Sequence, residues 1–163
     1  MTRSSLRLLS LTAALALGPV AASAQDAAPA APESQAAGAV VRSLGLIGRW
    51  AGDCAKPATL QNSYAVYAAN YSGDATLTYD RGKLYEPRVY DLSNAHSEDP
   101  TRVRYDEVSR TSQARINIAL VRDGDRIRVW SSVGADGKAL VVDGRLADDS
   151  GAETPWLSRC PLA

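Results

Sequence analysis

The chain has 163 residues, of which 45% are hydrophobic, and its 18 basic and 18 acidic side chains balance to a formal net charge of zero. A chain without excess positive charge is not an obvious partner for nucleic acid or for an anionic bilayer. With one His and two Cys, it also lacks the ligand sets of zinc enzymes, so we expect no metal site and no cofactor.

The N-terminus has the three parts of a secretory signal peptide. Arg3 and Arg7 form a basic region, residues 8–17 are mostly apolar, and residues 22–24, Ala-Ser-Ala, have the small side chains of a cleavage site. A transmembrane anchor needs roughly 20 apolar residues, about twice the length of this run. We therefore expect residues 1–24 to be a signal peptide and the mature protein to be periplasmic or secreted, without membrane insertion after cleavage.

The segment after the cleavage site is rich in Ala and Pro. Residues 25–38 contain no large apolar side chain, which predicts a disordered leader. Loss of the signal peptide removes two of the 18 basic side chains and none of the 18 acidic ones, so the mature net charge is near −2. The remaining residues 39–163 have the size of one domain.

Hydrophobic spacing predicts one helix followed by strands. Val40, Val41, Leu44 and Ile47 recur at helical intervals, which indicates a short helix over residues 39–48. From Trp50 onward apolar and polar residues alternate, as in half-buried strands. The alternating runs are residues 64–69, 75–80, 103–106, 116–120, 127–130 and 140–146, and further strands are expected near residues 50–54, 84–91 and 156–160.

The connections between the runs predict how the strands are arranged. Gly and Asp-Gly residues between them are typical of tight hairpin turns, and short turns favour an antiparallel meander of about eight strands. The exception is the polar stretch over residues 91–101, which we expect to be a long loop that leaves His96 in solvent.

The two cysteines lie near opposite ends of the domain, Cys54 at its start and Cys160 at its end. In an oxidising compartment two Cys of a small domain usually pair, so we expect a disulfide between them. Closing a loop of roughly 100 residues stabilises a fold by on the order of 4 to 5 kcal/mol in the chain-entropy model. Pairing of the first and last strands would close an all-β barrel with the disulfide at its seam, and a flattened β-sandwich is the alternative.

The tripeptide Gly48-Arg49-Trp50 resembles the Gly-x-Trp signature of lipocalin-like barrels. The resemblance implies that Trp50 closes one end of the barrel as a structural plug, beneath an Arg of the last strand, for which Arg159 is in position. With the terminal Cys pair, the chain is similar to small exported bacterial proteins of unassigned function. The second lipocalin signature, Thr-Asp-Tyr, is absent, so a barrel filled by its own side chains remains an alternative to a ligand cup.

Two groups of side chains suggest binding surfaces, each with a plainer structural interpretation. All seven Tyr lie between Tyr64 and Tyr105, where they line a pocket or an interface, or replace the absent Phe in the core. Four Arg occupy outward strand positions and form either a basic stripe for an anionic partner or a solvated face balanced by Asp123, Asp125 and Asp143. These arginines are Arg115, Arg126, Arg128 and Arg145.

The residues do not assemble an obvious catalytic set. There is no Gly-x-Ser-x-Gly motif, and both Cys are expected to be paired. Two pairs of carboxylates, Asp123 with Asp125 and Asp148 with Asp149, are expected to have a structural role in turns. We therefore expect a non-catalytic binding module and not an enzyme. As a protein-binding or inhibitor-like barrel, it would bind an unknown partner protein through the 91–101 loop. The alternative is a lipocalin-like carrier or sensor of a small apolar ligand.

Overall fold

The computed structural model describes residues 36–161, so the expected signal peptide and the leader as far as residue 35 lie outside the described residues. The described residues form one short helix and ten strands. In chain order the elements are α1 (Ala37–Ser43), β1 (Gly48–Ala51), β2 (Tyr64–Ala69), β3 (Ala75–Asp80), β4 (Arg88–Asp99), β5 (Arg102–Ser109), β6 (Arg115–Asp123), β7 (Arg126–Val133), β8 (Ala139–Val142), β9 (Arg145–Leu146) and β10 (Leu157–Cys160).

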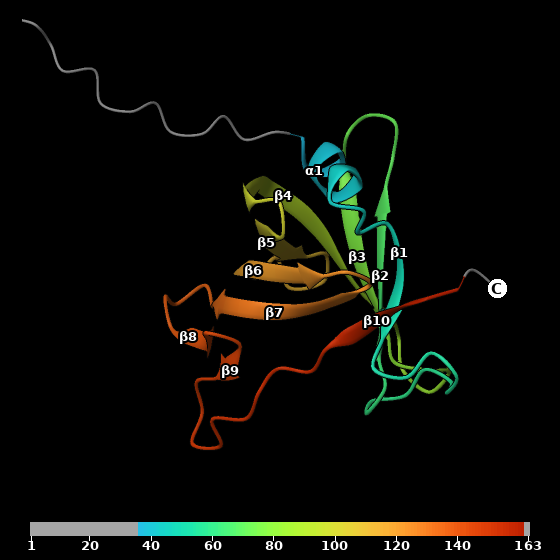
Figure 1. Ribbon diagram of the computed structural model, residues 1–163, viewed down its shortest axis with the longest axis vertical. Coiled ribbons are helices and arrows are strands. Elements are labelled where there is room, and N and C mark those ends of the chain that lie inside the picture. The colour runs from blue at the N-terminus through green and yellow to red at the C-terminus, as the bar shows by residue number, and fades with distance from the viewer. Residues whose placement is uncertain (1–35, 162–163) are drawn as a thin grey trace, which may run out of the picture. The chain divides into compact units, whose positions relative to one another are not determined.

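The strands form a closed antiparallel barrel (Figure 1). Strands β1 to β7 pair with their neighbours in chain order, and β10 pairs with both β1 and β7. These eight strands close the barrel, which confirms the predicted all-β meander and excludes the flattened sandwich. Strands β8 and β9 extend from β7 as a hairpin outside the ring.

The alternating pattern of the sequence determines which side chains fill the barrel. On β3, for example, Ala75 and Leu77 are buried while Thr76 and Thr78 are partly exposed. Tight turns reverse the chain between strands. Asp143 and Gly144, between β8 and β9, both have positive φ, as a two-residue hairpin turn requires.

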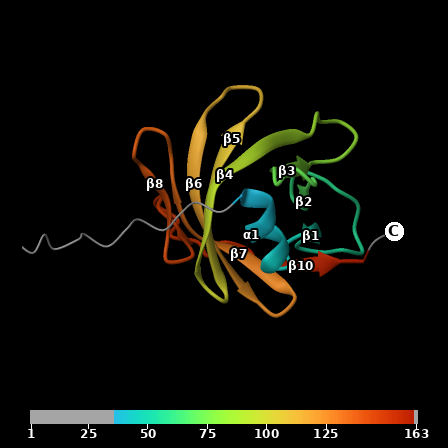
Figure 2. The ribbon, with the colours of Figure 1, turned by 90° about the horizontal axis from the view of Figure 1, so that it is seen from above.

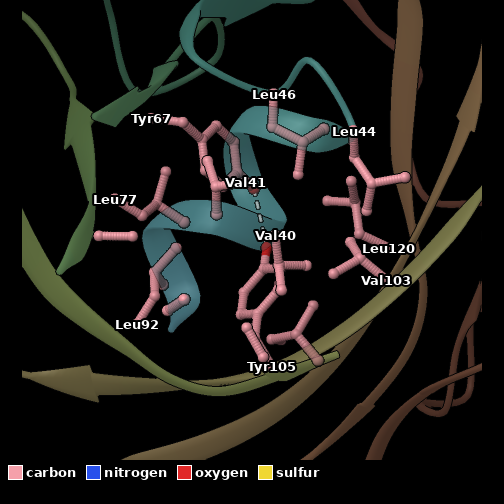
Figure 3. Packing of buried hydrophobic residues seen from close by; sticks show 14 of the residues in the cluster. Val40, Val41, Leu44, Leu46, Tyr67, Leu77, Leu92, Val103, Tyr105 and Leu120 are labelled. Atoms are coloured by element: carbon pink, nitrogen blue, oxygen red, sulfur yellow. Dashed lines mark hydrogen bonds between the residues drawn. The ribbon is translucent and has the colours of Figure 1, made fainter. Parts of the chain in front are cut away.

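Helix α1 fills one end of the barrel (Figure 2). Its apolar side chains Val40 and Val41 are fully buried and pack among residues of the barrel wall (Figure 3). Gly38 allows the close approach, because its N–H donates to the Gly73 carbonyl at 2.7 Å and a Cβ would lie 2.7 Å from that oxygen. The helix begins at Ala37, inside the expected leader. Within the described part of the chain, no helix has the length and apolar character needed to cross a bilayer.

Strand β4 runs through the stretch that was expected to be a long polar loop, so the loop predicted over residues 91–101 is wrong. The strand continues because β5 pairs with it along most of its length, with a register shift around Asn94. Asn94 has a φ of 51° and forms a β-bulge. Because of this bulge, the buried side chains of Leu92 and Ala95 are three residues apart, which hides the alternation in the sequence.

Two other strand predictions have different bounds in the structure. Residues 81–87 form a loop, and β4 begins only at Arg88, because Pro87 has no N–H to donate to a neighbouring strand. The single strand expected over residues 140–146 is the hairpin of β8 and β9, which bends at Asp143 and Gly144.

The predicted disulfide is present between Cys54 and Cys160, whose Cα atoms are 5.3 Å apart. Cys160 ends β10, and Cys54 follows β1, so the bond links β10 to the segment just after β1, next to the seam where these two strands pair. Ala51, Tyr64 and Cys160 form a small buried cluster separate from the main core.

Candidate functional site

Trp50 and Arg159 lie at the closed end of the barrel, opposite each other on β1 and β10. Trp50 is fully buried, and the guanidinium carbon of Arg159 is 4.5 Å from its ring centroid. The Trp50 Nε1–H donates to the Leu46 carbonyl at 2.7 Å, and Arg159 donates to the carbonyls of Gly45 and Ile47. Both side chains therefore connect the seam of the barrel to the segment that follows α1, a structural role without assigned chemistry.

The other end of the barrel holds a pocket of about 500 Å³, here called the open-end pocket. It lies between the β3–β4 loop at residues 81–87 and the β5–β6 turn at residues 110–114. Helix α1 is at the other end of the barrel, because it contacts the β2–β3 turn at the opposite end of β3. Small-molecule sites in proteins have volumes of roughly 300 to 1,000 Å³. Residues that line the pocket include Arg81, Glu86, Arg88, Tyr90, Ser109 and Ile116.

A buried carboxyl group lies one inward strand position from Ser109, which lines this pocket. Glu107 is only 4% exposed and continues the inward series of Val103 and Tyr105 on β5. In the sheet register it lies opposite Leu92 on β4 and Ile116 on β6, and Ile116 lines the pocket. Burial raises the pKa of Glu107 to about 7, and a hydrogen bond from Tyr79 acts in the opposite direction. A barrel-lining carboxyl group is therefore poised to change charge near neutral pH.

The tyrosines divide between the core, the pocket and the surface. The hydroxyl groups of Tyr67 and Tyr105 are 2.8 Å apart in the core, and their rings meet edge to face. Tyr79 and Tyr90 also meet edge to face, with ring centroids 5.7 Å apart, and Tyr90 lines the open-end pocket. Burial, and then the Glu107 charge, raise the pKa of Tyr79. Both sequence interpretations of the Tyr cluster thus apply, to different members of it.

The rim of the open-end pocket carries charged side chains. Arg81 donates to the Glu86 carbonyl at 2.9 Å, and its guanidinium lies 5.6 Å from the centroid of the Tyr85 ring. Arg88 makes no ion pair with any of residues 36–161. The three charged side chains of the rim, Arg81, Glu86 and Arg88, therefore give it a net positive charge of about one.

The four arginines for which the sequence left open a basic stripe or a balanced face are paired with acidic side chains. Arg115 pairs with Asp106 and Arg126 with Asp123, while Arg128 and Arg145 share Glu153. The face is therefore balanced, although Asp123 is the only one of the three expected acidic partners that pairs with these arginines in the structure. Arg126 and Arg128 also stack on the Trp156 ring, with the guanidinium carbons 4.9 and 4.8 Å from its centroid. This arrangement fixes the segment before β10 against β7.

The other candidates from the sequence lie apart from the open-end pocket. His96 is on the outer face of β4 rather than in a loop, with Nδ1 3.1 Å from the Asn94 carbonyl. Asp148 accepts hydrogen bonds from Ser150 in a turn. Among residues 36–161, no three His, Cys, Asp or Glu side chains lie close enough together to hold a metal ion.

Glu107 was missed by the sequence analysis, although a signal for it exists. Val103 and Tyr105 identify the inward positions of their strand, and the next inward position is Glu107. A charged residue at an inward strand position is unusual, and an unusual buried charge is often functional.

Comparison with known proteins leaves this geometry as the basis for any functional interpretation. No protein-family model matches the chain, and neither the curated proteins nor the solved structures include a significant match to it.

Proposed function

We propose that this protein is a non-catalytic carrier or sensor that binds a small organic ligand in the open-end pocket. The observation that carries the proposal is the pocket itself, with its volume of about 500 Å³ at the end of the barrel that α1 leaves open. Its wall combines the apolar surfaces of Tyr90 and Ile116 with the polar groups of Ser109 and Arg88. A mainly apolar wall with a few polar groups is typical of small-ligand sites.

A protein-binding, inhibitor-like module is the second candidate. The 91–101 loop that would have contacted a partner is strand β4, so this function needs another surface. Leu84 is 90% exposed, and Leu60 and Tyr85 are also exposed on the neighbouring loop segments near the pocket. Exposed apolar side chains that lie together often contact another protein.

We further propose that the protein is exported to the periplasm or secreted. The N-terminal basic, apolar and Ala-x-Ala segments support export. The disulfide between Cys54 and Cys160 fits an oxidising compartment, where such bonds persist.

Native mass spectrometry of the full chain, purified from the periplasm of an expressing bacterium, tests these functions. A retained small molecule supports the carrier, and a stoichiometric protein supports the module. Ile116→Trp fills the pocket and should abolish retention of the small molecule, whereas Thr78→Trp, on the outer face of β3, should retain it. Wild-type protein that retains no small molecule and binds no added aromatic probe contradicts the carrier function. Turnover that survives rigorous purification contradicts both candidates.

A further inference from the structure

Two adjacent acidic residues of β5 have opposite environments. Asp106 faces outward and accepts hydrogen bonds from Asn94, Asn117 and Arg115 at 2.7, 2.8 and 2.9 Å. Burial raises the pKa of Asp106, but these three donors outweigh it and the net shift is downward. Glu107 faces inward, and no Lys or Arg of residues 36–161 pairs with it. The barrel interior therefore contains a carboxyl group without a counterion, a costly arrangement for its charged form.

Three buried tyrosines, Tyr67, Tyr79 and Tyr105, lie near enough to this carboxyl group for its charge to raise their pKa values. Tyr79 on β3 is near enough to lower the pKa of this carboxyl group, and the ring of Tyr90 on β4 packs nearly perpendicular to that of Tyr79. Tyr67 and Tyr105 lie deeper in the same interior. Electron-rich aromatic faces attract organic cations, and a carboxylate adds a full opposite charge. The combination is complementary to an ammonium group.

The open-end pocket ends one inward position above this set of groups, because Ser109 lines it and Glu107 is the preceding inward residue of β5. Ile116 and Tyr90 line the pocket, and Glu107 lies opposite Ile116 in the register of β5 and β6. Tyr90 is the ring that connects the pocket to Tyr79. Glu107 itself does not line the pocket, so a ligand reaches it only when the side chains of Ile116 and Tyr90 move aside.

We propose that the ligand of the open-end pocket is a small organic monoamine, whose ammonium group pairs with the Glu107 carboxylate beside Tyr79 and Tyr90. This inference rests on the proposed carrier function and specifies its ligand class. The apolar body of the amine lies against Ile116 in the pocket. A polyamine is disfavoured, because its second charge would lie near Arg81 and Arg88 at the rim.

The pairing makes amine binding depend on pH through one group. The titratable side chains that face Glu107 are Tyr67 on β2, Tyr79 on β3 and Tyr105 on β5, and burial raises the pKa of all three, so they stay neutral near pH 7. Because the pKa of Glu107 is about 7, its charged form is depleted in mildly acidic solution. An amine should therefore bind about a hundredfold more weakly at pH 5 than on its plateau above pH 8.

Isothermal titration calorimetry with a matched pair of ligands tests the inference. Tryptamine and indole-3-ethanol have the same aromatic body, but only tryptamine carries an ammonium group. At pH 8 we expect tryptamine to bind at least about tenfold more tightly than indole-3-ethanol, since a charge-assisted contact is stronger than a neutral one by an amount of that order. At pH 7 its binding should release about half a proton, measured by comparing buffers of different ionisation enthalpy.

Glu107→Gln should remove the preference for tryptamine while indole-3-ethanol still binds. If that variant does not fold, the Glu107 carboxyl carbon of the wild type can be titrated by NMR, where saturating tryptamine should lower its pKa. Equal affinity of the wild type for the two ligands, or an unchanged pKa on tryptamine addition, overturns the monoamine and leaves the carrier function intact. Absence of binding by either ligand, or by any aromatic probe, contradicts the carrier function itself.

Discussion

The guanidinium of Arg159 lies 4.5 Å from the ring centroid of Trp50, and the same side chain donates to the carbonyls of Gly45 and Ile47. Arg159 belongs to the last strand and Trp50 to the first, and both accepting carbonyls lie between α1 and β1. One side chain thus holds together the seam of the barrel and the segment that connects to its helical end. Cys160, the next residue, adds a covalent bond to the same seam.

Arg159→Ala should destabilise the fold by about 2 to 4 kcal/mol, because it removes a cation–π contact and charge-assisted hydrogen bonds to two carbonyls. In a domain of this size the melting temperature should fall by about 5 to 15 °C. Thermal unfolding followed by circular dichroism measures the loss, and Trp fluorescence should change because Trp50 becomes more mobile.

Arg110→Ala is the matched control for this prediction. Arg110 makes an ion pair with Asp91, but both side chains are 55% exposed, and such surface pairs contribute about 0 to 1 kcal/mol. If Arg159→Ala has the same melting temperature and fluorescence spectrum as the wild type, the contact between Arg159 and Trp50 does not close the barrel end.

The disulfide should account for a large part of the stability. Cys54 and Cys160 are separated by 106 positions, and closing such a loop stabilises the fold by about 4 to 5 kcal/mol in the chain-entropy model. Urea unfolding with and without a reductant should show a difference of that order. Thiol labelling of the unfolded, unreduced protein should find no reactive group, and two labelled thiols would refute the bond.

Local patterns predicted much of this fold because most strands keep one phase of alternation. Residues 75–80 and 127–130 have the alternation of strands in the sequence, and they lie in β3 and β7, which pair with neighbours on both sides in the barrel. Strand β4 was misread because the bulge at Asn94 changes which residues face inward. Its continuation depends on pairing with β5, a tertiary interaction that period-two spacing does not encode.

The candidate site was less predictable than the fold. Glu107 could have been located from the phase of Val103 and Tyr105, but its burial depends on strands brought together only by barrel closure. The open-end pocket lies between two loops far apart in sequence, at residues 81–87 and 110–114. Its volume depends on how these loops diverge, and residue spacing does not determine that.

Gly38→Ala should destabilise the protein even though Ala is the better helix former by about 1 kcal/mol. The added Cβ would lie 2.7 Å from the Gly73 carbonyl oxygen, so α1 would have to move away from the β2–β3 turn. We expect a net loss of about 1 to 2 kcal/mol, measured by urea unfolding. Ala39→Gly, at an exposed position of the same helix, serves as the propensity control. Higher stability of Gly38→Ala would mean that the helix does not pack against this turn.

The buried Glu107 should make the protein more stable in mildly acidic than in mildly alkaline solution. Its pKa rises from 4.5 to about 7 on folding, so the folded state binds more protons than the unfolded state between these values. Stability from this group is therefore fully present below pH 4.5 and is lost as the pH rises to about 7, by about 3 kcal/mol in total. Asp106 has a lowered pKa, so its contribution is lost only when the pH falls below about 4.

Melting temperatures of the wild type and of Glu107→Gln between pH 5 and pH 8 separate this effect from other ionisations. The wild type should lose stability across this range, while the variant, whose side chain is neutral at every pH, should show a flatter profile. Asp106→Asn is the matched control, because it removes the neighbouring carboxylate on the outer face and should leave the slope between pH 5 and pH 7 in place. The same slope in the wild type and in Glu107→Gln would assign the pH dependence to a different group, and Glu107 would then be neutral or hydrated throughout this range.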